Sequence, residues 1–439
     1  MSSSSSRRAQ MRVIGSTTRT ARWIQAVTAV SLIAGWSAVA VAQEAAKPAE
    51  AAKPPENTVR AEVGKAIQAA RELIQAKKYK DALAKVHEAE IVPNLTPYEK
   101  FAIDLTRGSA AQGAGDNDVA LSSFESVVAS GRLPPADQAK VIAATAELYY
   151  QVKNYAKAIQ WAQRYEKEGG NDPAIHQVLI QAYYLAGENA NAARLLKEEI
   201  EAEEKADRVP TEDKLLLLAS CYLKMNDNAG YSLALEKLVA HYPKKSYWAD
   251  LISRVRRKPG YSERLDLDVL RLQLATGNLT KPAEYMEAAQ LALQAGFPSE
   301  AKKIMEQGYA AGLLGKGAEA ERENRLRDLA SKQAAQDAAA IAKGESEADS
   351  AKDGDTLIAI GYNYVLNGKA ERGLALLEQG LKHGPLRHPE EAKLHVALAY
   401  LQAGQKAKAV QMLQTVHGND ATADLARLWV LQANRSAAS

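Results

Sequence analysis

Cysteine is almost missing from this sequence, and aromatic side chains are few. Cys221 is the only thiol, so no disulfide can form within the chain. We expect this cysteine to be a small buried residue of a helix and not a reactive thiol. Aromatic residues make up 6% of the chain, whereas alanine is abundant. Because alanine loses no side-chain entropy in a helix, this composition favours helices over sheets.

The sequence also lacks the motifs of the common enzyme classes. There is no HExxH, Cys/His cluster, GxGxxG, glycine-rich phosphate loop or GxSxG elbow. The best metal candidate is the group His388, Glu391 and His395, in which the last two lie four residues apart on one expected helix. We expect these three side chains to be exposed at the start of a repeat. The sequence therefore predicts no catalytic residue, no cofactor, no metal and no enzyme activity.

Acidic residues are absent from the first 42 positions, which contain five arginines. Without that segment the chain has 51 basic and 53 acidic residues, so charge implies no nucleic-acid partner. A basic start, an apolar stretch from Trp23 to Val41 and the sequence Ala40-Val41-Ala42 are typical of a secretory signal peptide. We expect cleavage after Ala42 and a periplasmic protein without a lipid anchor. The alternative is an uncleaved segment that anchors the chain in the inner membrane.

From Val59 onward, small and apolar residues recur at helical spacing. In the stretch TLIAIGYNYVLNGKAERGLALLEQGLKHGP, Gly361 and Tyr364 lie on one face of a first helix, and Gly373 lies on a second. The pattern returns 36 residues later at Tyr400 and Ala409. Such a period, with small residues where helices cross, indicates a helical-repeat protein. Pro385 ends the clearest unit. Tyrosine occupies the equivalent position of five first helices: Tyr149, Tyr183, Tyr222, Tyr364 and Tyr400.

The chain resembles the tetratricopeptide repeat (TPR) family. Gly361, Tyr364, Leu377 and Pro385 match the family pattern of a small residue, an aromatic, a large apolar residue and a closing proline. The chain departs from that pattern because it has no tryptophan at the usual first-helix position. The resemblance implies an all-α fold, a right-handed α-solenoid of about ten antiparallel helix pairs.

The repeats divide the expected chain into segments. The signal peptide (1–42) is followed by a disordered Ala/Pro-rich tether (43–58). The remaining segments are N-terminal repeats (59–243), a degenerate repeat plus one repeat (244–312), a charged Ala-rich helix with an acidic loop (313–355), two C-terminal repeats (356–418) and a capping helix with a tail (419–439). Within the degenerate repeat, the basic run Arg254, Arg256, Arg257 and Lys258 is expected to be a solvated helix face, with contact to an anionic partner as the alternative.

The resemblance also implies where a partner binds. In this family the residues beside the core tyrosine of each first helix face a concave groove. Carried onto this chain, they give a candidate peptide-binding set: Glu147, Tyr150, Gln151, Gln177, Gln181 and Tyr184. An aromatic side chain flanked by amides suits the binding of an extended peptide. The alternative is that Tyr150 and Tyr184 both pack between helices. We expect a non-catalytic periplasmic scaffold that binds a protein or peptide, or else an accessory subunit of a cell-envelope machine for TonB-type energy transduction, transport or outer-membrane assembly. A third hypothesis is a hydrolase or metal-dependent enzyme that acts on cell-wall material, and it predicts stoichiometric zinc in the pure protein.

Overall fold

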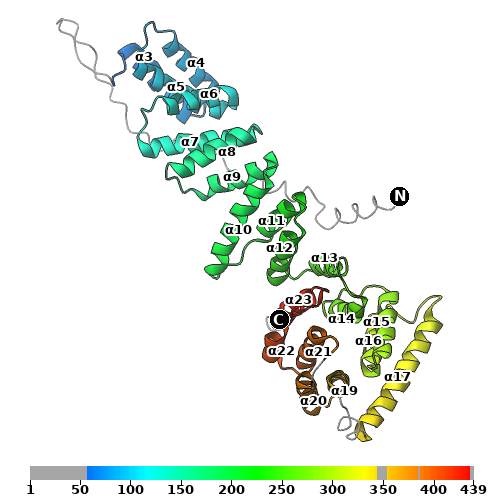
Figure 1. The fold of residues 1–439 in the computed structure, drawn as a ribbon. Coiled ribbons are helices and arrows are strands. Elements are labelled where there is room, and N and C mark those ends of the chain that lie inside the picture. The colour runs from blue at the N-terminus through cyan, green and yellow to red at the C-terminus, as the bar shows by residue number, and fades with distance from the viewer. Residues whose placement is uncertain (1–56, 344–352, 384–385, 436–439) are drawn as a thin grey trace, which may run out of the picture. The chain divides into compact units, whose positions relative to one another are not determined.

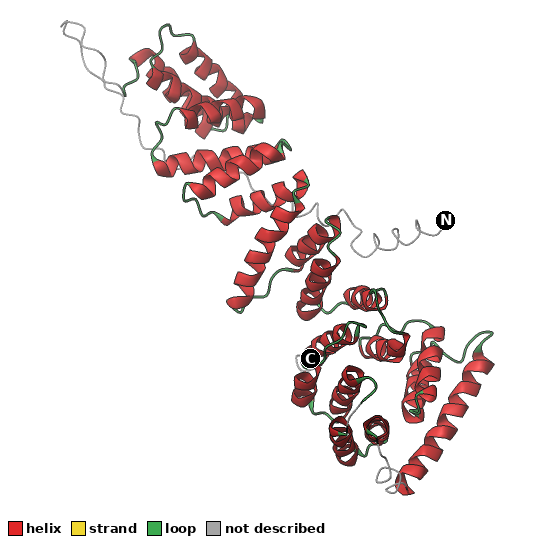
Figure 2. Ribbon diagram, in the orientation of Figure 1, coloured by secondary structure: helices red, strands yellow, loops and turns green. Residues whose placement is uncertain are grey.

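The computed structural model describes residues 57–343, 353–383 and 386–435. These residues form helices joined by short turns, and no strand occurs among them (Figure 2). The expected signal peptide, nearly all of the tether, most of the acidic loop and Pro385 lie outside the described residues. The helices follow one another in antiparallel pairs, as in an α-solenoid, so the predicted fold class is confirmed.

The described residues divide into two compact units. The N-terminal unit comprises residues 57–208 and 220–227. Its helices are α3 (Ala61–Gln75), α4 (Tyr79–Glu90), α5 (Pro97–Ala114), α6 (Asn117–Ala129), α7 (Pro135–Gln151), α8 (Tyr155–Lys167), α9 (Pro173–Ala186) and α10 (Asn189–Lys205). Helix α11 (Glu212–Lys224) contributes its last residues to this unit and its first residues to the other.

The C-terminal unit comprises residues 209–219 and the described residues from 228 onward. Its helices are α12 (Asn228–His241), α13 (Lys245–Arg256), the 3-10 turn η1 (Glu263–Leu265), α14 (Asp266–Ala275), α15 (Pro282–Gln294), α16 (Pro298–Ala310), α17 (Ala320–Lys343), α19 (Gly354–Leu366), α20 (Ala370–Lys382), α21 (Pro389–Gln402), α22 (Lys406–Leu413) and α23 (Thr422–Arg435).

Local sequence sets the helix ends, as α5 illustrates. The Thr96 hydroxyl accepts a hydrogen bond from the Glu99 backbone N–H at 3.1 Å, and the Glu99 carboxylate accepts one from the Thr96 N–H at 2.9 Å. This capping box satisfies backbone donors that have no partner within the helix. Pro97 occupies the first turn, where no donor is needed, and Gly115 ends the helix at φ 78°. The turn into α6 is thus fixed by its own residues.

The core tyrosines tie each first helix to the helix before it. The Tyr149 hydroxyl donates to Glu125 of α6 at 2.6 Å, and the Tyr400 hydroxyl donates to Glu378 of α20 at 2.5 Å. Tyr183 and Tyr364 are buried as well, whereas Tyr222 is only half-buried. Four of the five equivalent tyrosines therefore pack in the core as the repeat pattern predicts.

Glycine is required where α19 crosses α20. A Cβ placed on Gly361 would lie 2.7 Å from the Gly373 carbonyl oxygen, and one on Gly373 would lie 2.6 Å from the Gly361 oxygen. The two backbones approach more closely than any side chain allows. The corresponding Ala409 of α22 is fully buried, so an alanine suffices in the next pair.

The last helix returns to the start of the C-terminal unit. Helix α23 contacts α12 and α14 as well as its neighbours α21 and α22 (Figure 1). Leu425, Ala426 and Leu428 are buried there, and Gln432 donates a hydrogen bond to the Ala275 carbonyl oxygen at 3.0 Å. The helices of this unit consequently close into a ring. Of the helices that the structure describes, none has the length and apolar character that crossing a membrane requires.

Candidate functional site

The predicted peptide-binding residues of the N-terminal unit are partly used for packing. Tyr150 on α7 is buried, and its hydroxyl donates to the Gln181 side-chain oxygen of α9 at 2.7 Å. Its ring lies 5.9 Å from the ring of Tyr155. This hydrogen bond occupies the Tyr150 hydroxyl and the Gln181 amide oxygen, and it joins two successive first helices.

Three other members of the set reach the surface. Tyr184 is half-buried, its hydroxyl lies 2.8 Å from the Ser220 hydroxyl, and the Lys224 ammonium lies 3.6 Å from its ring centroid. Gln177 is half-buried and donates to Glu199, and Gln151 is exposed. Tyr184 with its cation is therefore the accessible aromatic of this surface, and the role of the whole set stays a prediction.

Glu147 is the unusual member of the set because its side chain is 3% exposed. Burial, with a smaller contribution from the charge of Asp172, raises its pKa to about 7 from an ordinary value of 4.5. The N-terminal unit thus contains a carboxyl group with a pKa near neutral pH, at a position that the family resemblance assigned to the groove.

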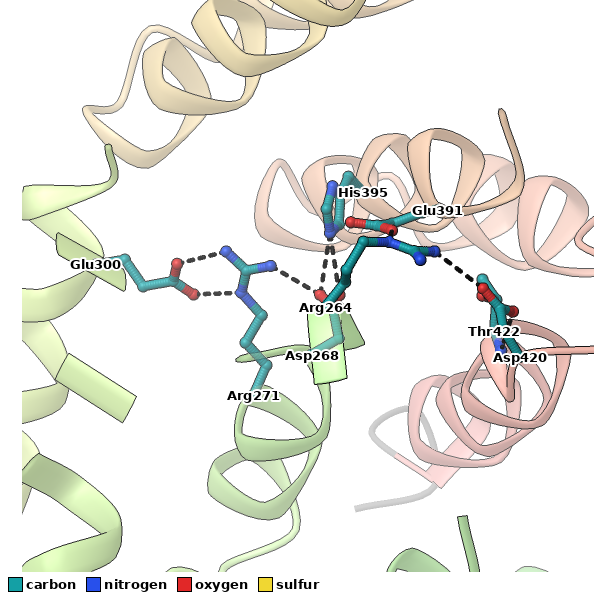
Figure 3. A network of polar contacts seen from close by, with 8 residues as sticks. All are labelled: Arg264, Asp268, Arg271, Glu300, Glu391, His395, Asp420 and Thr422. Carbon is teal, nitrogen blue, oxygen red and sulfur yellow. Dashed lines mark hydrogen bonds and ion pairs between the residues drawn. The ribbon is translucent and has the colours of Figure 1, made fainter. Parts of the chain in front are cut away.

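The C-terminal unit contains a network of buried charges centred on α14 (Figure 3). Asp268 is 1% exposed and accepts a hydrogen bond from Arg271 at 2.7 Å. Arg271 also donates to both carboxylate oxygens of Glu300 on α16, at 2.8 and 2.6 Å. On the other side, His395 Nε2 of α21 lies 3.1 Å from each oxygen of Asp268. Burial alone would raise the pKa of Asp268, but its interactions with His395 and Arg271 outweigh burial and lower the pKa to about 2.

A second arginine extends this network toward α23. Arg264 in η1 pairs with Glu391 of α21 and with Asp420, both at 3.0 Å. Asp420 in turn accepts from the Thr422 hydroxyl at 2.6 Å. Residues more than 120 positions apart in the sequence are therefore joined by charge at one place.

The basic run at the C-terminal end of α13 forms ion pairs within the same unit. Arg254 pairs with Asp250 at 3.1 Å and lies over the Tyr231 ring, at 4.0 Å from its centroid. Arg256 lies 3.7 Å from Asp266, and Lys258 pairs with Asp424 of α23. The expectation of a solvated helix face is wrong for these three side chains. Asp250 of the same helix pairs with Arg254, and acids from α14 and α23, which the sequence could not place nearby, pair with Arg256 and Lys258.

A cavity of about 280 Å³ lies between α14, α16, α19, α21 and α23. We call it the C-terminal cavity. Its apolar wall includes six leucine, isoleucine and valine side chains: Leu274, Ile304, Val365, Leu366, Leu398 and Leu401. Arg271, Lys303, Gln307, Tyr362 and Gln402 add polar groups. The arrangement is the usual one for a binding cavity, an apolar wall with a few convergent polar groups.

Tyr362 connects the cavity to the charge network. Its ring packs edge-on against Phe297 with centroids 5.0 Å apart and lies 5.9 Å from the His395 ring. The Arg271 guanidinium lies 5.0 Å from its centroid. Burial raises the pKa of Tyr362, so its hydroxyl stays neutral. The network thereby holds one wall of the cavity in place.

Sequence reasoning missed this site because α14 falls in a segment interpreted as a degenerate repeat. A signal was present in LDLDVLRLQL, where Asp268 and Arg271 interrupt an apolar helix three residues apart. Charges at that spacing on a buried face must pair with each other or with another element. The partners Glu300 and His395 could not be named without the fold.

The structure replaces one residue of the metal candidate that the sequence suggested, because Asp268 takes the place of His388. Among the described residues, Glu391 and His395 form a potential ligand group with Asp268, and their donor atoms lie within 4.8 Å of one another. His388 precedes α21, is exposed and does not belong to this group. The helical pair that the sequence suggested is thus completed by a residue 127 positions away.

No protein-family model matches the chain, and no curated protein matches it. Among solved structures, the TPR domain of P58(IPK) is 14% identical over 86% of this chain and 99% of its own, with a TM-score of 0.23. Yeast Tom70 is 15% identical over 86% of this chain and 95% of its own, with a TM-score of 0.22. A likeness at this level carries no inference about what the chain binds.

Proposed function

We propose that the chain is a non-catalytic scaffold whose C-terminal cavity receives a segment of a protein partner. The observation that carries the proposal is the cavity itself, about 280 Å³ in volume and formed by five helices of a ring closed by α23. Apolar side chains cover part of the wall, and Lys303, Gln307 and Gln402 are exposed at polar positions of its lining. A partner side chain would bury apolar surface while its backbone meets these polar groups.

The cavity is pre-formed, which lowers the cost of binding. Arg271, Glu300 and Tyr362 belong both to its lining and to the buried network. Side chains held by several contacts lose little further freedom when a ligand arrives. The surface around Tyr184 in the N-terminal unit is a second candidate, favoured by the cation that lies over its ring.

Site-specific photo-crosslinking in intact cells tests the cavity. A photoreactive amino acid replaces Lys303 or Gln307, which line the cavity, or Glu306, which is exposed on the same helix but does not line it. We expect one discrete adduct from positions 303 and 307 and a much weaker one from position 306. Equal adducts at all three positions would contradict partner binding in the cavity. A photoreactive amino acid at position 184 tests the second candidate surface, and an adduct from that position alone would place the partner site there.

We further propose that the chain is exported and works in the periplasm. The proposal rests on the basic and apolar pattern of residues 1–42. Amino-terminal sequencing of the protein from cells should find Gln43 as its first residue. Quantitative release with the soluble periplasm favours the free scaffold, whereas retention on membranes after a salt wash favours the accessory subunit of an envelope machine.

A further inference from the structure

Asp268, Glu391 and His395 offer one imidazole and two carboxylates from two helices that are distant in the sequence. Helix α21 brings Glu391 and His395 to one face because they are four residues apart, and α14 places Asp268 opposite them. The His395 ring points at Asp268 in Figure 3. The donor atoms lie within 4.8 Å of one another, and side-chain rotations that shorten the longest separation by about 1.4 Å would bring them to the roughly 3.4 Å spacing of ligands around tetrahedral zinc.

Each carboxylate has an oxygen that no arginine holds. Arg271 donates to Oδ1 of Asp268, and Arg264 donates to Oε2 of Glu391. Within the described residues, no guanidinium donates to Oδ2 of Asp268 or to Oε1 of Glu391. The arginines therefore orient the two carboxylates as outer partners do in metal sites, and they leave one oxygen of each for a cation.

The charges of the network do not balance. Two guanidinium groups, those of Arg264 and Arg271, pair with four carboxylates. With His395 neutral, the network has a net charge of two negative. The carboxylates are those of Asp268, Glu300, Glu391 and Asp420. Asp268 is buried, so this excess is only partly screened by water. A divalent cation would neutralise it.

We propose that Asp268, Glu391 and His395 bind one zinc ion, which clamps α14 to α21 in the ring of the C-terminal unit. An imidazole together with carboxylates suits zinc, whereas calcium and magnesium take oxygen ligands. The side chains of Glu391 and His395 are 17% and 20% exposed, which gives the ion a path from solvent and leaves its fourth position to water. With His395 neutral and its proton on Nδ1, Nε2 is free to ligate, and the ion replaces the hydrogen bond between Nε2 and Asp268. The site serves architecture, and it does not depend on partner binding in the cavity.

Zinc titration of the full-length, untagged protein tests the site. The protein is freed of metal with a chelator and titrated with zinc chloride. Bound zinc is measured by elemental analysis after gel filtration, and its affinity by competition with a chromophoric chelator. We expect about one zinc ion per chain in the wild type. We expect affinity to fall by about 100-fold in His395→Gln and by at least about 10-fold in Glu391→Gln, because each variant loses a ligand.

His388→Gln is the matched control, since His388 is exposed near the same helix and lies outside the ligand group. Its affinity should equal that of the wild type within about 2-fold. Glu391 is partly exposed, so Glu391→Gln keeps the test decisive if His395→Gln does not fold, as judged by circular dichroism. Less than about 0.1 zinc ion per wild-type chain would show an ion-pair network alone and overturn the proposal. Undiminished zinc binding in the folded ligand variants would also overturn it.

Discussion

Arg271 and Glu300 form a doubly hydrogen-bonded ion pair at the wall of the C-terminal cavity. Nε of Arg271 lies 2.8 Å from Oε1 of Glu300, and its second terminal nitrogen lies 2.6 Å from Oε2. The arginine side chain is 6% exposed and the glutamate side chain 12%. Because bidentate pairing fixes both distance and orientation, this pair sets the position of α16 against α14.

Replacing Arg271 should be costly for stability. Arg271→Met leaves Glu300 and Asp268 without their buried cation, and we expect a loss of about 3–5 kcal/mol in the free energy of unfolding. Urea unfolding followed by circular dichroism measures it. The double variant Arg271→Met/Glu300→Gln should lose less than the sum of the two single variants.

The matched control for this change is Arg325→Met on α17. Its side chain is 71% exposed, and its one ion pair among the described residues is with exposed Glu321 at 3.6 Å, so we expect a change below about 0.5 kcal/mol. Equal losses in both arginine variants would show that the buried pair does not organise the unit.

The crossing of α19 and α20 predicts intolerance of alanine at Gly361. The new methyl group would meet the Gly373 carbonyl oxygen at 2.7 Å, so the helices must separate. We expect Gly361→Ala to lower the melting temperature, with a loss of about 1–3 kcal/mol.

Gly64→Ala provides the comparison for that substitution. Gly64 lies inside α3, and a Cβ there would meet only Val59, at an ordinary 3.8 Å. Alanine should stabilise this helix by up to about 1 kcal/mol. A neutral Gly361→Ala variant would contradict the close backbone approach.

Glu147 predicts a dependence of stability on pH. Its pKa is about 7 in the folded chain against an ordinary 4.5, so between these values the folded state holds a proton that the unfolded state releases. The free energy of unfolding should therefore fall as pH rises from 4.5 to 7, by at most about 3 kcal/mol from this residue.

Glu147→Gln should remove that part of the pH dependence and raise stability above pH 7. Glu72→Gln, which changes an exposed glutamate of α3, should leave the slope as it is in the wild type. Urea unfolding at a series of pH values measures both variants. An identical slope in wild type and Glu147→Gln would place the titrating group elsewhere.

Closure of the ring predicts a large effect at Leu425 of α23, which is fully buried. Leu425→Ala should lose about 2–5 kcal/mol of unfolding free energy, because it leaves a cavity where α23 packs on other helices. Leu329→Ala changes a leucine that is 45% exposed and should lose far less. A small effect at Leu425 would mean that α23 is not part of the folded unit.

The repeat pattern was predictable from sequence because it is local. Gly361 and Tyr364 are three residues apart, and helical geometry alone puts them on one face. The same logic predicted the helix pairs and the buried tyrosines. Helical spacing could not predict that the Tyr150 hydroxyl donates to Gln181, since that contact depends on how two repeats stack.

The charge network could not be predicted for a different reason. Glu391 and His395 share a helix, and their spacing was visible, but Asp268 joins them only because α23 returns to α12 and α14 and closes the ring. The wrong expectation for Arg256 and Lys258 has the same origin, since their acids lie on α14 and α23. A charged run is interpreted as solvated unless the acids opposite it are known.

Whether a partner occupies the C-terminal cavity is tested most directly by filling it. Ala275 lines the cavity, so Ala275→Trp should occupy the space, whereas Ala310→Trp adds the same side chain at an exposed position of α16 that does not line it. With the photoreactive residue at position 303, we predict that the adduct falls by about 10-fold or more in Ala275→Trp and persists in Ala310→Trp, with both proteins equally folded. An adduct of unchanged yield in Ala275→Trp would contradict partner binding in this cavity.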